Sequence, residues 1–380
     1  MLPQGRPLLE VLAEIPDFRA AQGLRHPLSA ILALGCCAAL CGYHSYGAMA
    51  EWGRNYGGRL VRALGFTREQ TPCAATLHTV FRQLEVTEFE TRLGAWAESW
   101  LGAEAMPDTA LEGVAVDGKT LRGSRKQGAA GTHLLSALSH RLGVTLGQQA
   151  VDAKTNEIPQ AEELLTALVV AGRVFTMDAL LTQKDLAQQI VDGGGDYVMI
   201  VKGNQPPLQE DLATVFALGP VPDEQRQEAH TVEVGHGRIE ERELTSSDVL
   251  AGYSTWPGLQ QVFQVARETT EKKSGKERAE IVYGVTSLRM ERASAACLLG
   301  LVRGQWTIEN RSHWVRDVTF DEDRSQVRSG KVPQVMAAIR NTAIGLLRLA
   351  GETNIAAACR RMAAQPEQAL ALIGIKLKTE

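Results

Sequence analysis

The sequence predicts a mixed α/β fold in which an all-helical domain precedes a sheet and a β-rich insertion interrupts it. Three observations lead to this fold class. Residues 1–106 show helical periodicity, residues 107–205 alternate strands with helices around one hairpin, and residues 206–290 alternate apolar with polar side chains. A doubly wound parallel sheet would lack the hairpin, so a mixed sheet with flanking helices is favoured.

The N-terminal domain, residues 1–106, contains the clearest helix of the chain. Pro27 precedes the apolar run Leu28–Cys41 and suits the first turn of a buried helix. Glycine and proline pairs separate three further helical stretches, Tyr46–Leu64, Ala75–Leu84 and Thr87–Leu101. Such a layer could bind DNA or serve only as a packing platform, because it contains no recognisable helix-turn-helix pattern.

The core, residues 107–205, opens with the alternating run Gly113–Asp117. The runs His133–Ser139 and Val144–Val151 alternate around a turn at Gly143 and predict an antiparallel hairpin. Helices and buried strands then alternate, in the order Asn156–Ala171, Val174–Met177, Thr182–Asp192 and Asp196–Val201. Strand, hairpin, helix, strand, helix and strand is the order of a ribonuclease H-like core.

The second part of the core follows the insertion. Within residues 206–290 the helical period fades and three runs alternate, Thr231–Leu244, Gln260–Thr269 and Ala279–Leu288. The stretch Leu298–Arg316 is helical again and belongs to the second core segment, residues 291–350, which a helical tail at residues 351–380 follows. A whole subdomain therefore separates the core strands from the helix that completes the core.

Composition and charge narrow the class of protein. Hydrophobic residues make up 44% and charged residues 22% of the chain, which is typical of a globular protein. A net charge of −4 argues against a uniformly basic coat for nucleic acid, so any DNA-binding face must be local. One candidate is the segment from Arg311 to Arg348, in which basic residues outnumber acidic ones.

Nothing in the sequence predicts a membrane protein. The longest apolar run, Leu28–Cys41, is shorter than the roughly 20 residues that span a bilayer. Residues 1–19 lack the pattern of a signal peptide, so we expect a cytoplasmic protein. The six cysteines form no CxxC pair, which favours reduced thiols packed in apolar helices.

Three carboxylates stand where the local pattern would aim a side chain out of a packed element. Asp117 and Asp178 each end a buried strand, and Glu309 belongs to the helical stretch after the insertion. Carboxylate oxygens are the ligands that Mg²⁺ prefers. Two such ions held about 3.5–4 Å apart clamp the attacking and leaving oxygens of a phosphodiester. The pattern therefore indicates a metal site.

A competing motif overlaps the first of these carboxylates. Gly113 to Thr120 fits the phosphate-loop pattern G-x-x-x-x-G-K-[ST] letter for letter, which would indicate an ATPase. A phosphate loop must follow a strand and open a helix, whereas the residues between the two glycines are themselves strand-like. The ATPase is therefore kept only as a remote alternative.

Collinear motifs along nearly the whole chain resemble those of the H-repeat-associated (ISAs-type) transposases. These are bacterial insertion-sequence enzymes of the DDE superfamily. The matching motifs are Val116-Asp-Gly-Lys-Thr-Leu-Arg-Gly-Ser124, Met177-Asp-Ala-Leu-Leu-Thr-Gln183, Gly195-Asp-Tyr197, Lys202-Gly-Asn-Gln205, Ile308-Glu-Asn310, His313-Trp-Val-Arg-Asp-Val-Thr-Phe320 and Glu322-Asp323. The helical region Leu8–Leu101 also resembles the domain associated with this family. Two positions depart from the pattern, since Leu181 and Gln305 stand where relatives often carry histidine.

The resemblance implies a function and a set of partners. Asp117, Asp178 and Glu309 would bind two Mg²⁺ ions, for which Mn²⁺ can substitute, and would cut DNA at insertion-sequence ends and join it to target DNA. The partners would be double-stranded DNA and a second copy of the chain, with the protein at the bacterial nucleoid when it acts. The alternative is a catalytically silent DNA-binding protein descended from a transposase.

Further residues near the triad are candidates for contacts with DNA or with the metal ligands. The predicted DNA contacts are Lys119, Arg122, Lys202, Arg303, Arg311 and Arg316. Asn310 and His313 could orient Glu309, and Asp317 is its rival as third ligand because it lies two helical turns away. Trp306 and Trp314 could stack on bases, although packing of the helix onto the sheet is favoured for both.

Overall fold

The computed structural model describes most of the chain, namely residues 5–20, 24–103, 110–126, 130–151, 156–217, 225–235, 237–252 and 254–377. The chain divides into two compact units. The first comprises Met1–Met106, Gly118–Asn156 and Ile308–Glu380, and the second comprises Pro107–Asp117 and Glu157–Thr307. Each unit is thus assembled from segments that are distant in sequence. The predicted domain boundary at residues 106–107 lies outside the described residues.

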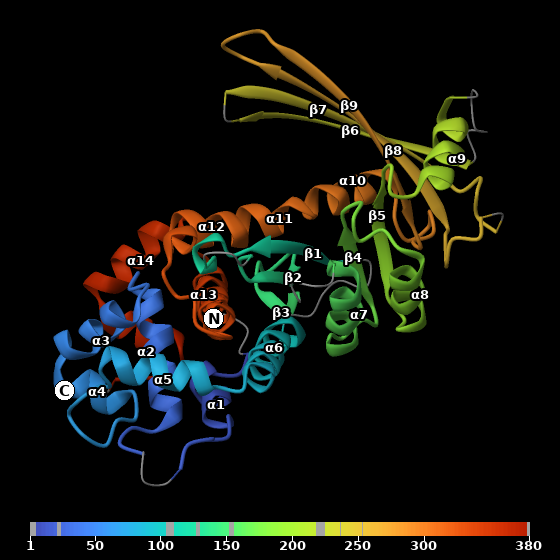
Figure 1. Ribbon diagram of the computed structural model, residues 1–380. Coiled ribbons are helices and arrows are strands. Elements are labelled where there is room, and N and C mark those ends of the chain that lie inside the picture. The colour runs from blue at the N-terminus through green and yellow to red at the C-terminus, as the bar shows by residue number, and fades with distance from the viewer. Residues whose placement is uncertain are drawn as a thin grey trace. The chain divides into compact units, whose positions relative to one another are not determined.

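Helices form most of the first unit, in blue and red in Figure 1. They are α1 Leu8–Ala13, α2 Leu28–Leu40, α3 Tyr46–Asn55, α4 Gly57–Ala63, α5 Ala74–Gln83, α6 Val86–Ala103, α12 Trp314–Val318, α13 Val332–Leu349, α14 Ile355–Ala364 and α15 Pro366–Leu372. Helix α2 is buried along almost its whole length because its residues are apolar or small and α1, α3 and α13 pack around it. The predicted buried helix at Leu28–Cys41 is confirmed.

The first unit also contains a hairpin. Strands β2 (His133–Ser139) and β3 (Thr145–Val151) are antiparallel, and Gly143 adopts a φ of 66° in the turn between them. Hairpin strand β2 lies next to β1 (Glu112–Thr120), which gives the strand order β3-β2-β1. The hairpin predicted from the alternating runs is confirmed.

The second unit contains the parallel strands. Strand β1 pairs in parallel with β4 (Arg173–Met177), β4 pairs in parallel with β5 (Asp196–Val201), and β5 pairs antiparallel with β9 (Glu277–Thr286). The helices of this unit are α7 Glu157–Ala167, α8 Lys184–Asp192, α9 Pro206–Ala217 and α10 Ala295–Gly304. A mixed sheet of this order, with flanking helices, is the predicted ribonuclease H-like fold class.

The insertion consists of helix α9 and four long antiparallel strands. Strands β6 (Arg226–Gly235), β7 (Arg238–Ser247), β8 (Gln261–Glu271) and β9 follow one another in the sheet (Figure 1). The sequence interpretation of Thr231–Leu244 as one alternating run missed the tight turn between β6 and β7, where Gly237 has a φ of 77°. Leu244, Phe263 and Val265 form a core with Leu298 of α10, which covers one face of these strands.

Two expectations about composition can be compared with the described residues. No described helix is long and apolar enough to cross a membrane. All six cysteines are free thiols, and Cys36, Cys37, Cys41 and Cys359 are buried as expected for core residues. Cys73 is exposed, so the packing interpretation does not extend to it.

Gly284 of β9 is a position where we expect a single methyl group to destabilise the protein. A Cβ there would overlap the Phe263 ring and lie 2.8 Å from the Met199 carbonyl oxygen. Gly284→Ala should therefore lower the free energy of unfolding by about 1–3 kcal/mol in urea titrations. Gly300→Ala is the control, because an added Cβ at this helical position meets nothing within 4 Å. An equal loss in both variants would contradict the steric argument.

Candidate active site

Asp117 and Asp178 are the residues that follow the last residue pair between the parallel strands β1 and β4. Strand β4 ends at Met177 as predicted, but β1 continues to Thr120, so the prediction that Asp117 ends its strand is corrected. In the parallel pairing of β1 with β4, Val116 is the partner of Met177. The next residue on each chain is therefore one of the two predicted acids, at the carboxyl edge of the parallel strands. This edge is where open α/β sheets bind their ligands. The sequence signals for this placement were the alternating run before Asp117 and the apolar run before Asp178.

The surroundings of Asp178 penalise its negative charge. Burial raises the pKa of this carboxyl, and the charge of Glu157 raises it further. The backbone N–H groups of Leu180 and Leu181 donate to Oδ1 at 3.0 and 3.3 Å and act in the opposite direction. A carboxylate whose charge costs free energy in the folded protein is stabilised by a nearby cation. The carboxylate of Asp178 is therefore suited to bind a metal ion.

Gln305 bridges the two strands immediately before these acids. Its Nε2 donates to the Val116 carbonyl at 2.9 Å, and its Oε1 accepts a hydrogen bond of 2.6 Å from the Thr176 hydroxyl. One amide thus contacts both β1 and β4 one or two residues before each strand reaches its Asp. The sequence presented Gln305 as a departure from a family pattern and, at 3.6 residues per turn, as a residue on one helical face with Glu309, His313 and Arg316. Neither observation predicted this bridge.

Glu309 lies in the first unit at the start of a π-helical turn. The chain continues from α10 through α11 (Trp306–Ile308) into this turn, Glu309–His313, and then into α12 (Trp314–Val318). Isolated π turns within α-helices occur frequently at functional sites. Glu309 and Asn310 are exposed, whereas His313 is only 1% exposed. The acid is thus presented to solvent above a buried imidazole.

His313 contacts the carboxylate of Glu309, as the sequence predicted for an orienting residue. Its Nδ1 lies 3.2 Å from Oε2 of Glu309. This hydrogen bond lowers the pKa of Glu309, although burial acts in the opposite direction. Burial lowers the pKa of His313. A neutral imidazole that donates from Nδ1 to an ionised Glu309 accounts for both shifts.

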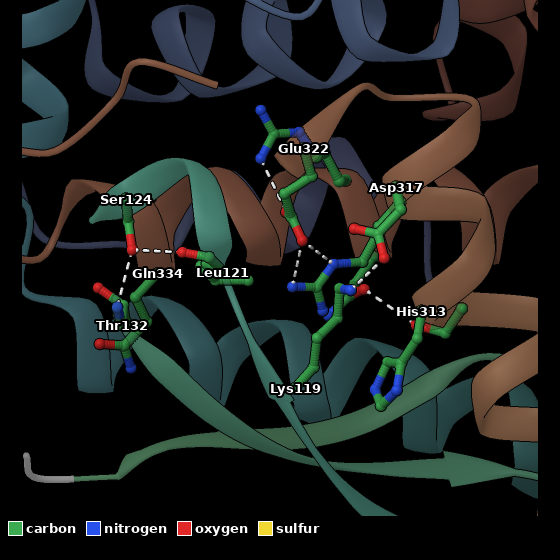
Figure 2. A network of polar contacts seen from close by, with 12 residues as sticks. Lys119, Leu121, Ser124, Thr132, His313, Asp317, Glu322 and Gln334 are labelled. Atoms are coloured by element: carbon green, nitrogen blue, oxygen red, sulfur yellow. Dashed lines mark hydrogen bonds and ion pairs between the residues drawn. The ribbon is translucent and has the colours of Figure 1, made fainter. Parts of the chain in front are cut away.

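Asp317, the rival third ligand, is paired with a lysine of the same unit. Lys119 Nζ forms an ion pair with Oδ2 of Asp317, and Figure 2 shows the two side chains directed at one another. Burial raises the pKa of Asp317 and the ammonium of Lys119 lowers it. Only 9% of the Lys119 side chain is exposed. This pairing favours Glu309 over Asp317 and leaves little of Lys119 exposed to DNA.

Arg316 is buried, which corrects its predicted contact with a DNA phosphate. It is 0% exposed, and its Nε donates to Glu322 Oε2 at 2.9 Å. Arg340 donates to the other oxygen of Glu322 at 2.8 Å, and neither of these residues is more than 3% exposed. The three side chains form an internal Arg–Glu–Arg cluster. Arg316 is therefore a structural residue in this conformation.

Arg311 and Arg303 are also engaged within the protein. The guanidinium of Arg311 donates to the carbonyls of His140, Arg141 and Leu142, so it fixes the β2–β3 turn instead of a phosphate. Arg303 forms an ion pair with Glu233 of β6. These contacts correct the prediction for Arg311 and occupy Arg303.

Arg122 and Lys202 are exposed to solvent, as a residue that contacts DNA must be. The Arg122 side chain is 71% exposed and lies 3.7 Å from Asp323, and Lys202 is exposed after β5. The two tryptophans are exposed as well, Trp306 by 59% and Trp314 by 54%. The favoured interpretation that both pack a helix onto the sheet is therefore wrong.

Sequence reasoning missed a buried network that ends at the π-helical turn. Gln148 donates to Glu90 of α6 and accepts from Asn341 at 2.9 Å, and Asn341 in turn accepts from Ser312 at 3.4 Å. Gln334 also donates to Glu90, at 2.9 Å. Glutamine and asparagine in amphipathic stretches give no sequence signal for such long-range contacts.

Glu90 should make the stability of the protein depend on pH. Burial raises its pKa to about 8, although Gln148 and Gln334 donate to the carboxylate. Between pH 4.5 and about 8 the folded chain keeps a proton that the unfolded chain has released, so stability falls as pH rises through this window. Glu90→Gln should remove a slope of about 1.4 kcal/mol per pH unit from unfolding titrations. Glu85→Gln, at an exposed site, is the control, and an unchanged slope in Glu90→Gln would contradict the argument.

Comparison with known proteins gives matches along most of the chain. The family model described as Transposase DDE domain matches residues 108–346, and the one described as DDE_Tnp_1-associated matches residues 9–97. "Putative transposase YncI" of Escherichia coli O157:H7 is 33% identical over 90% of this chain and 87% of its own length. "H repeat-associated putative transposase YhhI" of Escherichia coli K12 is 29% identical over 90% of both chains. The resemblance seen in the sequence motifs is confirmed.

A solved structure is similar at lower identity. The piggyBac transposase, in a cryo-EM structure of its synaptic complex with hairpin DNA, aligns with 95% of this chain and 76% of its own at 12% identity. The TM-score is 0.41.

Proposed function

The chain belongs to the DDE transposase family, and from this premise we propose that it cuts DNA at the ends of a bacterial insertion sequence and joins the freed 3′ ends to target DNA. The observation that carries the proposal is the placement of Asp117 and Asp178 directly after the last residue pair of two parallel strands. Relatives named as transposases over 90% of the chain support the same function. We propose that the protein acts on bacterial chromosomal DNA in the cytoplasm.

We propose that Asp117, Asp178 and Glu309 hold two Mg²⁺ ions, for which Mn²⁺ can substitute. Their oxygens are the donors that such hard cations prefer. Bound in pairs, these ions activate the attacking oxygen and stabilise the leaving oxygen of a phosphodiester. The raised pKa of Asp178 supports the assignment, because a positive charge at this position would relieve the cost of burying its carboxylate.

The neighbouring residues would hold the ligands in position. Gln305 fixes the spacing of β1 and β4 through two hydrogen bonds, and so fixes the strand ends that carry Asp117 and Asp178. His313 restrains the rotamer of Glu309 through its Nδ1. Preorganised ligands reduce the reorganisation that would otherwise raise the barrier.

We propose that double-stranded DNA binds through the cations that remain exposed. The exposed Arg122 and Lys202 would contact phosphates, which position DNA without reading its sequence. Trp306 and Trp314 offer aromatic surface for stacking on a base of an opened end. Because two element ends must be joined to one target, the active form is expected to contain two copies of the chain.

A strand-transfer assay tests the function. Purified protein is mixed with DNA that carries the sequences flanking its gene, with a target plasmid and with Mg²⁺, Mn²⁺ or EDTA. We expect cleaved ends and joined products with either metal and none with EDTA. Metal-independent cleavage would contradict the proposal, and binding without cleavage would favour the silent DNA-binding alternative.

The remote ATPase alternative does not agree with the structure. Strand β1 continues through Gly118, Lys119 and Thr120, whereas a phosphate loop would leave the strand and open a helix. Lys119 is paired with Asp317 instead of being available to a phosphate. The pattern match at Gly113 to Thr120 is therefore accidental.

A further inference from the structure

The outer parts of strands β6–β9 expose apolar side chains on one face. Val232, Val234 and Ile281 are 53%, 63% and 57% exposed. Directly opposed residues of antiparallel strands point to the same face. The register places these residues on one face, in the rows His230-Glu243-Ala266-Ile281, Val232-Glu241-Glu268-Ala279 and Val234-Ile239-Thr270-Glu277. We call these three rows the acidic apolar face.

On the opposite face of the same strands, the side chains pack against α10 or form ion pairs with one another. At its base Leu244 and Val265 pack against α10. Farther out, arginines and glutamates form ion pairs with one another, Arg242 with Glu233 and Glu240, Arg238 with Glu240, and Arg267 with Glu280. That face therefore has both packing partners and charge partners within the unit.

The acidic apolar face has fewer such partners among the described residues: His230 Nε2 lies 3.9 Å from Oε2 of Glu241, and no lysine or arginine forms an ion pair with its glutamates. Helix α9 covers only the base of this side of the strands, where Phe216 stacks on Tyr283. Beyond it, Glu241, Glu243, Glu268 and Glu277 are exposed beside the apolar side chains, and the described residues of the three rows include no lysine or arginine. Strands β6–β9 run on past α9 and α10 in Figure 1.

The charge of this face decides the class of partner. DNA binding depends on neutralising phosphates with lysine and arginine, so a face with four glutamates and no such cation would repel DNA. Exposed apolar side chains rimmed by charged ones are typical of protein interaction sites. The face is therefore suited to a protein that carries basic residues near an apolar stripe.

The same strands carry the complementary charge at their tip. Lys272, Lys273 and Lys276 are exposed in the turn between β8 and β9. If two copies of the sheet stack face to face with their strands antiparallel, each lysine turn lies over the glutamates nearer the base of the other copy. The apolar rows then meet at the centre, about 10 Å apart backbone to backbone. Such a surface is self-complementary, as a two-fold dimer requires.

We propose that the acidic apolar face docks a second copy of this chain, with Val232, Val234 and Ile281 at its centre and the lysine turn of each copy on the glutamates of the other. The proposal rests on the proposed function, because joining two element ends requires two copies. It names the surface that brings them together.

Sedimentation velocity of the full chain, without DNA or metal, tests the docking surface. We expect the wild type to dimerise and the double variant Val232→Asp and Val234→Asp to dissociate, with a Kd raised by about tenfold or more. Val169→Asp is the control, because Val169 is also 53% exposed but lies outside the acidic apolar face. A monomeric wild type, or a double variant that dimerises as the wild type does, would overturn the proposal.

Exchanging the charges of the lysines and the glutamates shows whether a variant fails to dimerise because it has lost the contact or because it has not folded. Lys272→Glu with Lys273→Glu should weaken the dimer, and so should Glu241→Lys with Glu243→Lys. All four changes together should restore it, and failure of the combined variant to recover would overturn the antiparallel arrangement. The dimerisation measurement is made without DNA and without metal. A protein that dimerises but never cleaves DNA would therefore contradict only the proposed function.

Discussion

Asp178→Asn should abolish metal-dependent DNA cleavage and strand transfer while leaving the protein as stable as the wild type or more so. An amide cannot neutralise a bound cation, and the loss of a group that acts directly on the reaction costs about 10⁴–10⁶-fold in rate. Stability should not fall with activity, because burial raises the pKa of Asp178 and the ionised carboxylate therefore destabilises the folded protein at neutral pH.

Two measurements on this variant separate the effects. Strand-transfer assays with Mg²⁺ report the reaction, and thermal unfolding without metal reports stability. Asp185→Asn, in the first turn of α8, is the control and should leave cleavage unchanged. Cleavage retained in Asp178→Asn would remove this residue from the metal site, and a marked loss of Tm would show that its carboxylate is structural.

The positions of Asp117 and Asp178 could be predicted because their signals are local. The alternating run before Asp117 and the apolar run before Asp178 each specify a strand, although β1 continues past Asp117 to Thr120. The structure then places both acids directly after the pairing of Val116 with Met177. Gln305 could not be assigned in this way, because its contact with Thr176 spans 129 residues of sequence.

The face of the last core helix was predicted wrongly for a geometric reason. The sequence interpretation assumed 3.6 residues per turn from Gln305 through Glu309 and His313 to Arg316, which would place all four on one face. The turn Glu309–His313 is π-helical and adds a residue, so the residues after it are rotated by roughly 100°. Arg316 consequently points into the interior instead of sharing the face of Glu309.

Burial of a charged residue is hard to predict when its partner is not adjacent. In the sequence analysis, Arg316 and Arg340 were assigned to a basic surface segment, because the sequence near them does not show that one of the acidic residues is buried. Glu322 stands in an acidic run in which Asp321, with a side chain 54% exposed, has the ordinary environment of a surface residue. Only the fold distinguishes Glu322, at 2% exposure, from its neighbours.

Glu322→Gln should destabilise the protein by about 3–5 kcal/mol, the cost of removing one member of a buried ion cluster. Burial opposes the ionisation of Glu322, and the guanidinium groups of Arg316 and Arg340 outweigh it, so its pKa is lowered. Its contribution is therefore present above pH 4.5 and is lost as the pH falls through its folded-state pKa. Denaturant titrations at pH 7 and at acidic pH should show the difference between wild type and variant shrinking with acidity.

Two comparisons show whether the uncompensated arginines cause the loss. Asp321→Asn, one residue away on the surface, should change stability by less than about 0.5 kcal/mol. Combining Glu322→Gln with Arg316→Met and Arg340→Leu should recover most of the lost stability, because well-packed apolar side chains replace buried ion clusters at little or no cost. If the combined variant stays as unstable as Glu322→Gln alone, the cluster stabilises the fold through its own hydrogen bonds, and the loss does not arise from buried charge left without a partner.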